Sequence, residues 1–108
     1  MLLVESKEKL KELKERFEDV QLSLGTDALE RELEEIDKKM AESDFWSDGE
    51  KAKSLTQRRK VLEENIKALK SVERSLRDVE EFLEITSEED LESLQMIEEE
   101  LKNAEKLI

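Results

Sequence analysis

Residues 48–85, DGEKAKSLTQRRKVLEENIKALKSVERSLRDVEEFLEI, decide the fold of this chain. The stretch contains no proline, and its only glycine is Gly49 at the start, so nothing interrupts a helix before Ile85. At about 1.5 Å per residue such a helix is roughly 55 Å long. Its apolar residues recur at helical spacing: Ala52, Leu55, Leu62, Ile66, Leu69, Val72, Leu76, Val79 and Leu83. The sequence therefore predicts one long amphipathic helix over 48–85.

The apolar stripe of this helix changes register part-way along. Ile66, Leu69 and Val72 follow one another in two successive steps of three, whereas a heptad seam alternates steps of three and four. The apolar face must therefore rotate around the helix at this point. We expect the long helix to change its packing partner near residue 70.

Two shorter helices are predicted before residue 48. The first carries a heptad seam with a single polar gap at Ser6: Leu3, Leu10, Leu13, Phe17, Val20 and Leu24. Gly25 directly follows the seam, at the position where a glycine in the left-handed conformation usually ends a helix. Asp27 with Glu30 resembles a capping box that starts a second helix. The predicted ranges are 1–23 and 28–43.

A fourth helix is predicted over 88–108. Thr86 and Ser87 precede Glu89 and Asp90 and make a second capping-box-like start. The stripe that follows has six members: Leu91, Leu94, Ile97, Leu101, Ala104 and Ile108. The predicted fold class is all-α, an antiparallel helical bundle resembling a coiled coil, with about four helices and a long third one. We expect a single helical domain over 1–108, and because no cap follows the last stripe residue, we expect the chain to be a fragment of a longer protein.

Composition narrows the possible functions. The 108 residues include 31 acids and 19 bases, for a net charge of −12, and no histidine or cysteine. This excludes thiol nucleophiles, Cys/His metal sites and histidine acid–base chemistry. We expect no enzyme activity, no catalytic residue, no metal and no cofactor. No apolar run approaches the ~18 residues of a membrane span, so we expect a cytoplasmic protein without a membrane partner.

Charge is unevenly distributed along the chain. Residues 51–70 hold seven bases and two acids, a balance of +5, whereas residues 79–100 hold ten acids and no base. Within the first range, Arg58, Arg59 and Lys60 either form a weak phosphate-binding patch or pair with acids of neighbouring helices. Because the acidic surplus repels phosphate, we expect little RNA binding by the chain alone. The acidic range either docks a basic partner or is simply solvated.

The segment before the long helix contains the only adjacent aromatic residues, Phe45 and Trp46. Either Ser47 or Asp48 is placed to cap the helix that follows. One interpretation is that both aromatic rings plug the end of the core, with the indole N–H of Trp46 reaching a turn carbonyl or water. The alternative is that the pair is an exposed docking anchor.

The string at residues 44–52, DFWSDGEKA, stands between a short helix and a long one. It resembles the Asp-Phe-Trp-x-Asp-Pro-Glu-x-Ala signature of the amino-terminal domain of bacterial peptide chain release factor 2. The resemblance extends over nearly the whole chain, although Gly49 replaces the usual proline. The matching signature residues, read as a structural corner, are Asp44, Phe45, Trp46 and Asp48.

The resemblance implies a non-catalytic amino-terminal domain of a peptide chain release factor that acts in translation termination on the ribosome. It also implies two partners, the stalk base of the large subunit and the GTP-hydrolysing release factor. The family's Gly-Gly-Gln hydrolysis motif does not occur in this chain. Heptads and high charge alone would equally support a free-standing helical adaptor or coiled-coil interaction protein. Apolar seam residues at the chain's end, such as Leu101, Leu107 and Ile108, also predict self-association.

Overall fold

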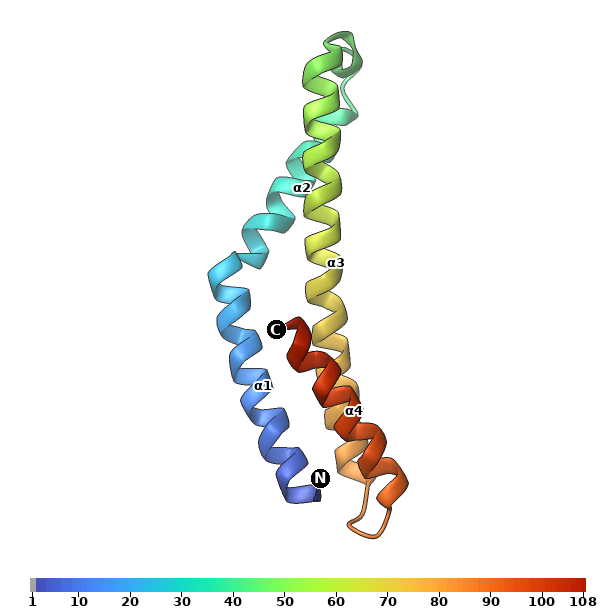
Figure 1. The fold of residues 1–108 in the computed structure, drawn as a ribbon. Coiled ribbons are helices and arrows are strands. Elements are labelled where there is room, and N and C mark those ends of the chain that lie inside the picture. The colour runs from blue at the N-terminus through green and yellow to red at the C-terminus, as the bar shows by residue number, and fades with distance from the viewer. Residues whose placement is uncertain (1) are drawn as a thin grey trace. The chain divides into compact units, whose positions relative to one another are not determined.

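The computed structural model describes residues 2–108, and none of them lies in a β-strand. The helices, shown in Figure 1, are α1 (Leu3–Leu24), α2 (Thr26–Met40), α3 (Gly49–Ile85) and α4 (Leu91–Leu107), with the short 3-10 helix η1 (Phe45–Ser47) before α3. The predicted all-α fold with four helices and a long third helix is confirmed. Residue 1, where the first helix was predicted to begin, lies outside the described residues.

The chain divides into two compact units, and α3 contributes to both. The terminal unit contains the residues up to Ser23 and those from Lys70 onward, and the central unit contains Leu24–Leu69. The division within α3 therefore falls between Leu69 and Lys70, where the apolar stripe rotates. This confirms the predicted change of packing partner near residue 70.

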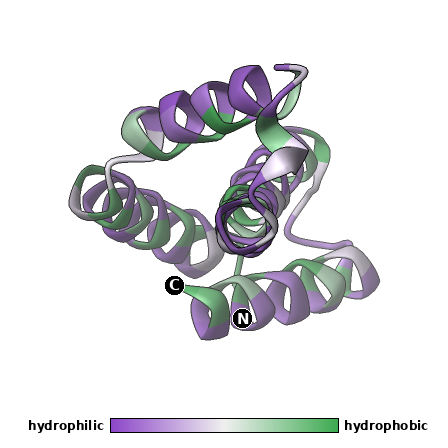
Figure 2. Ribbon diagram, turned by 90° about the horizontal axis from the view of Figure 1, so that it is seen from above, coloured by the Kyte–Doolittle hydropathy of each residue, from purple (hydrophilic) through white to green (hydrophobic). Residues whose placement is uncertain are grey.

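The terminal unit packs α1, the last part of α3 and α4 around one core. In Figure 1, α4 folds back beside the end of α3. The core side chains come from the predicted stripes: Leu10, Leu13, Phe17, Val72, Leu76, Val79, Leu83, Leu94, Ile97, Leu101 and Ala104. Figure 2 shows hydrophobic stretches of ribbon recurring along each helix between hydrophilic ones. Burial of these stripes supplies most of the favourable free energy of folding in this unit.

The central unit is a helical hairpin. The chain reverses at η1, so that α2 and the first part of α3 run antiparallel (Figure 1). Its buried side chains are Ile36, Phe45, Ala52, Leu62, Ile66 and Leu69. Leu29, Leu33 and Met40 on the predicted stripe of α2 are half-buried, as expected for a hairpin that has only one apolar interface.

The junction between α1 and α2 is made by Gly25. Its φ of 62° and ψ of 60° are left-handed, which confirms the predicted helix end. The α2 helix starts at once, at Thr26, and the amide of Leu29 donates to the carbonyl of Gly25 at 3.0 Å. The predicted capping box at Asp27 is therefore wrong, because Asp27 already lies inside the first turn.

The start of α4 also differs from the prediction. Asp90 is the N-cap: its Oδ1 accepts from the amide of Ser93 at 3.1 Å, and its Oδ2 accepts from the Ser93 hydroxyl at 2.8 Å. Both hydrogen bonds lower the pKa of Asp90, and the bond from the Ser93 hydroxyl has the larger effect. Thr86 instead donates its hydroxyl to the carbonyl of Phe82 at 2.6 Å, at the end of α3. Leu91, predicted to belong to the stripe, falls in the first turn and is 75% exposed.

Ser6, the polar gap in the seam of α1, is completely buried. Its hydroxyl has no hydrogen-bond partner among the described residues. A buried hydroxyl without a partner loses its hydrogen bonds to water on folding and gains none in return. The side chain of Ser6 therefore destabilises the terminal unit.

We expect Ser6→Ala to raise the thermal stability of the chain. The desolvation cost that the substitution removes is about 1–3 kcal/mol, which corresponds to an increase of several degrees in melting temperature followed by circular dichroism. Ser71→Ala, at an exposed position of α3, is the matched control, because it brings the same gain in helix propensity without a buried hydroxyl. Equal increases for the two variants would contradict the proposed cost.

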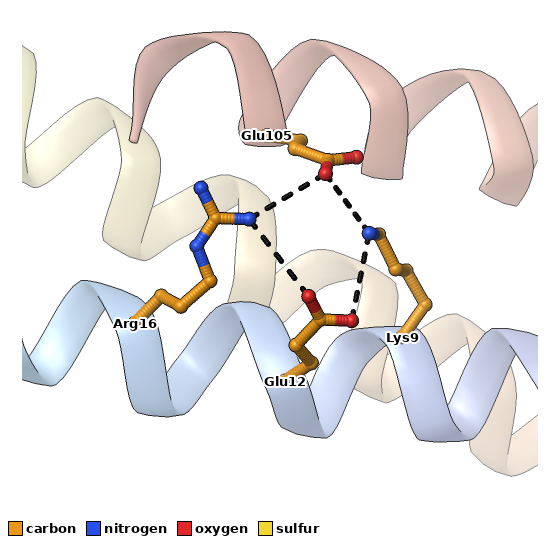
Figure 3. Close-up of polar contacts among 4 residues, drawn as sticks. All are labelled: Lys9, Glu12, Arg16 and Glu105. Carbon is orange, nitrogen blue, oxygen red and sulfur yellow. Dashed lines mark hydrogen bonds and ion pairs between the residues drawn. The ribbon is translucent and has the colours of Figure 1, made fainter.

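Four charged side chains form a closed network between α1 and α4 (Figure 3). Glu105 of α4 lies 2.9 Å from the Nζ of Lys9 and 3.4 Å from the Nη1 of Arg16. Glu12 lies 3.5 Å and 3.9 Å from the same two groups. The hydrogen bond and charge of Lys9 lower the pKa of Glu105, and the hydrogen bond that Lys9 donates to Glu105 raises the pKa of Lys9. Because the pKa of the Glu105 carboxyl is lower in the folded chain than in the unfolded chain, its ionised form stabilises the fold at pH values above the unfolded pKa. This stabilisation is lost as the pH falls through the folded pKa.

We expect Glu105→Gln to lower the melting temperature slightly at neutral pH. The difference from the native chain should shrink as pH falls through the folded pKa of Glu105, because the native carboxyl then also becomes neutral. It should persist to high pH, because the pKa of Lys9 is raised above 10.5. The measurement is a series of thermal melts across pH, with Glu8→Gln, at an exposed position of α1, as control. A deficit that does not depend on pH would show that the carboxylate charge is not involved.

Candidate functional site

The residues that carry the family resemblance form a tight corner between α2 and α3, which we call the aromatic corner (residues 44–48). Asp44 precedes η1, and its carbonyl accepts from the amide of Ser47 at 3.1 Å. The amide of Phe45 donates to the carbonyl of Glu42 at 3.2 Å. These two bonds turn the chain without glycine or proline, so the corner has a defined backbone.

Asp48 starts α3. Its Oδ1 accepts from the amide of Lys51 at 3.1 Å, and its carbonyl accepts from the amide of Ala52 at 2.9 Å. Of the two candidate caps, Asp48 is therefore the N-cap and Ser47 is not. A Cβ placed on Gly49 would meet no atom within 4 Å. A residue with a side chain would therefore fit at this position, where Gly49 replaces the proline of the signature.

The two aromatic rings of the corner have different environments. Phe45 is 8% exposed and belongs to the core of the central unit, whereas Trp46 is 61% exposed. Their ring centroids are 4.7 Å apart with an interplanar angle of 88°, an edge-to-face contact. The predicted burial of Trp46 is wrong, because successive side chains of a 3-10 turn point about 120° apart and only one of them can enter the core. The structure therefore presents Trp46 on the surface.

A hollow of about 420 Å³ lies beside the corner. Its lining combines charged and apolar side chains: Lys39, Glu42, Asp44, Phe45, Ser47, Asp48, Lys51 and Leu55. Within residues 2–108 no group of three or more His, Cys, Asp or Glu side chains is placed to hold a metal ion. The geometry of the corner is suited to contact with another macromolecule through Trp46.

Two of the three predicted phosphate-binding bases already have carboxylate partners. Arg58 donates through Nε and Nη2 to both carboxylate oxygens of Glu32, at 2.8 Å and 3.0 Å. The hydrogen bond and the charge of each partner raise the pKa of Arg58 and lower the pKa of Glu32. A bidentate pair of this kind fixes the guanidinium against the surface of α2.

Arg59 is held in a similar way. Its Nε lies 2.6 Å from Asp37, and its Nη1 lies 3.0 Å from Glu63. The hydrogen bond from Arg59 to Asp37 is the main cause of a raised pKa of Arg59. Lys60 is exposed and has no ion pair with any described residue. Phosphate binding by these three bases stays a prediction, and it would have to compete with the pairs in place.

No helix among the described residues is sufficiently long and apolar to cross a membrane.

Comparison with known proteins places the aromatic corner inside a recognised domain. Residues 29–108 match the family profile described as the PCRF domain. The chain belongs to the PCRF domain family. The match covers α2 from Leu29, the corner, α3 and α4, and α1 lies before it.

Relatives named peptide chain release factor 2 match the chain as well. The protein from Petrotoga mobilis is 35% identical over 108 residues, which is 100% of this chain and 29% of that protein. The protein from Clostridium perfringens is 35% identical over 100 residues, covering 93% of the chain and 28% of the relative. The protein from Thermosipho africanus is 37% identical over 73 residues, which is 68% of this chain and 20% of that protein. The resemblance seen in the corner motif is confirmed, and the chain spans less than a third of the length of these relatives.

Sequence reasoning missed several residues that the structure exposes or pairs. Glu32 and Asp37, the carboxylates of α2 that pair with Arg58 and Arg59, lie more than twenty residues away, and heptad spacing gave no signal for these two partners. Phe82 and Met96 each precede a buried stripe residue by one position and are 49% and 60% exposed. The sequence signal for their exposure was the position of these large apolar residues beside the buried stripe, among acidic neighbours.

We expect Phe45→Ala and Trp46→Ala to differ sharply in stability. Truncating a buried aromatic residue costs about 3–5 kcal/mol, so Phe45→Ala should lower the melting temperature by many degrees, whereas Trp46→Ala should change it little. Because Trp46 is the only tryptophan, native fluorescence should resemble that of indole in water and be readily quenched by acrylamide. A blue-shifted, protected emission would contradict the exposed position of Trp46.

Proposed function

We propose that this chain is a non-catalytic domain of a peptide chain release factor and acts in translation termination on the ribosome. The observation that carries this proposal is the PCRF match over residues 29–108, together with relatives named peptide chain release factor 2 that align along the whole chain. The sequence alone left a free-standing helical adaptor open as the alternative. The family match favours the release factor.

A docking role, without chemistry, is supported by what the chain contains. It has no histidine and no cysteine, and most of its charged side chains either pair with one another or lie exposed on helices. We propose that the domain contacts the ribosome at the stalk base of the large subunit and communicates with the GTP-hydrolysing release factor, in the cytoplasm. Both partners follow from the family resemblance.

The contact residue that we propose is Trp46. Tryptophan is enriched among the residues that dominate binding energies, and here it is exposed on a corner whose backbone is fixed by hydrogen bonds. Little ordering of the chain is then needed on binding, which favours affinity. The corner residues Asp44, Phe45 and Asp48 would act by holding Trp46 in place.

The test is co-sedimentation of the chain with ribosomes that carry peptidyl-tRNA and a stop codon. We expect the chain to bind these ribosomes and Trp46→Ala to weaken the binding about tenfold or more, a loss typical of an interface hot spot. Ribosomes that lack the stalk base should not bind the chain. Val61→Ala is the matched control, because Val61 is 46% exposed on α3 of the same unit. The chain alone should release no peptide.

Two outcomes would contradict the release factor proposal, and a third would contradict only the role of Trp46. Release of peptide by the chain alone would show that it is catalytic. Absence of any binding to ribosomes, with or without the GTP-hydrolysing release factor, would favour the adaptor function. Equal weakening by Trp46→Ala and Val61→Ala would remove Trp46 as the contact residue.

A further inference from the structure

An apolar groove runs between α3 and α4 in the terminal unit. It encloses about 180 Å³ and is lined by Asp78, Val79, Phe82, Ser93, Met96, Ile97 and Glu100. Pockets that enclose a whole small molecule measure roughly 300–1,000 Å³. The groove is therefore of a size for one or two side chains of a longer segment.

The floor and walls of the groove differ in burial. Val79 and Ile97 on the floor are 2% and 3% exposed, whereas Phe82 and Met96 on the walls are 49% and 60% exposed. Aromatic residues and methionine are enriched at protein interfaces, and the flexible thioether of methionine adapts to different partners. The walls thus leave apolar surface in water that a partner would cover.

The rim of the groove is acidic. Asp78 and Glu100 line it directly, and Glu92 and Glu99 lie four before and three after Met96, on the same face of α4. Residues 79–100 contain ten acids and no base. None of these four carboxylates forms an ion pair with any residue of the described range 2–108, whereas Glu80 pairs with Lys14 at 3.1 Å.

We propose that this groove docks a basic amphipathic segment of another protein, with an apolar side chain seated on Val79 and Ile97 between Phe82 and Met96. Lysine or arginine side chains of the segment pair with Asp78, Glu92, Glu99 and Glu100. A phosphate backbone or an anionic membrane is repelled by the same rim. A second copy of this chain would bring a further charge of −12.

The hairpin that forms the groove is held in place before any partner arrives. Asp90 caps α4 through two bonds from Ser93, and Thr86 bonds back to the carbonyl of Phe82. Leu83, Leu94 and Leu101 of the same two helices are buried in the core. A preformed groove avoids the cost of ordering the hairpin on binding.

The probe is a synthetic helical peptide of leucine and lysine, with the leucines at helical spacing. Two matched peptides replace either every lysine by glutamate or every leucine by serine. The chain has three methionines, of which Met96 lies in the groove and Met40 in the central unit, so methyl-labelled methionine reports the site directly. We expect the leucine–lysine peptide to shift the Met96 methyl signal and leave that of Met40 unchanged, and both matched peptides to bind much more weakly.

Variants of the native chain test the groove by fluorescence anisotropy of the labelled peptide. We expect the double substitution Asp78→Lys/Glu100→Lys to weaken binding about tenfold or more, as expected when attraction is replaced by like-charge repulsion. The control Glu34→Lys/Glu35→Lys changes the net charge equally at exposed positions of α2. It should have an effect of less than about twofold, because neither residue lines the groove. Phe82→Gln should weaken binding, whereas Leu22→Gln, at a position 77% exposed on α1, should not. Thermal melts establish that each variant is folded.

Several results would overturn the proposal. Equal weakening by the two charge-reversed pairs would show non-specific attraction to an acidic chain. Simultaneous shifts of Met40 and Met96 would show that the peptide has no defined site. A Met96 signal that moves with protein concentration without peptide would assign the groove to a second copy. Tighter binding of an RNA oligonucleotide would assign it to nucleic acid. The test uses no ribosome, so its outcome is separate from that of the release factor proposal.

Discussion

The burial of one rotating apolar stripe governs this structure. The α3 helix is too long for α2 alone to cover, and its stripe turns where Ile66, Leu69 and Val72 follow at steps of three. The first part of α3 therefore packs in the central unit, and the part from Lys70 onward packs with α1 and α4. Each shorter helix exists as a stable element because it covers one side of this stripe, since isolated helices of this length are marginal in water.

Ion pairs within the chain determine which charged side chains remain available to other molecules. With 31 acids and 19 bases, the chain cannot pair every carboxylate. Some of the pairs that form join neighbouring helices, such as Glu105 with Lys9 and Arg16, and Glu32 with Arg58. Carboxylates that form no ion pair within residues 2–108 include four on the α3–α4 hairpin, Asp78, Glu92, Glu99 and Glu100. Exposed pairs of this kind add little stability, so their main consequence is to remove bases such as Arg58 from the surface available to other molecules.

Periodicity predicted the helices and their buried faces well, because a repeat of apolar residues reports burial directly. Local turn chemistry was less predictable, because several residues compete for each cap. Thr86, Ser87 and Asp90 can all start α4, and Asp90 prevails once the hydroxyl of Thr86 bonds to the last turn of α3. The exposure of Trp46 also lay beyond the sequence pattern, because the 3-10 geometry that separates it from Phe45 depends on how α2 and α3 meet. Partners distant in sequence, such as Glu32 and Arg58, have no periodic signal at all.

The same helices that bury the stripe also hold the exposed apolar side chains in fixed positions. Trp46 stands on a corner closed by backbone bonds and the cap at Asp48, and Phe82 and Met96 stand on a hairpin closed by Asp90. Their exposure costs the isolated chain favourable burial, and rotation of either helix to bury them would expose stripe residues such as Leu62 or Val79. Burial of the stripe therefore determines which apolar side chains remain for partners, so the surfaces open to binding are a consequence of the fold's principal constraint.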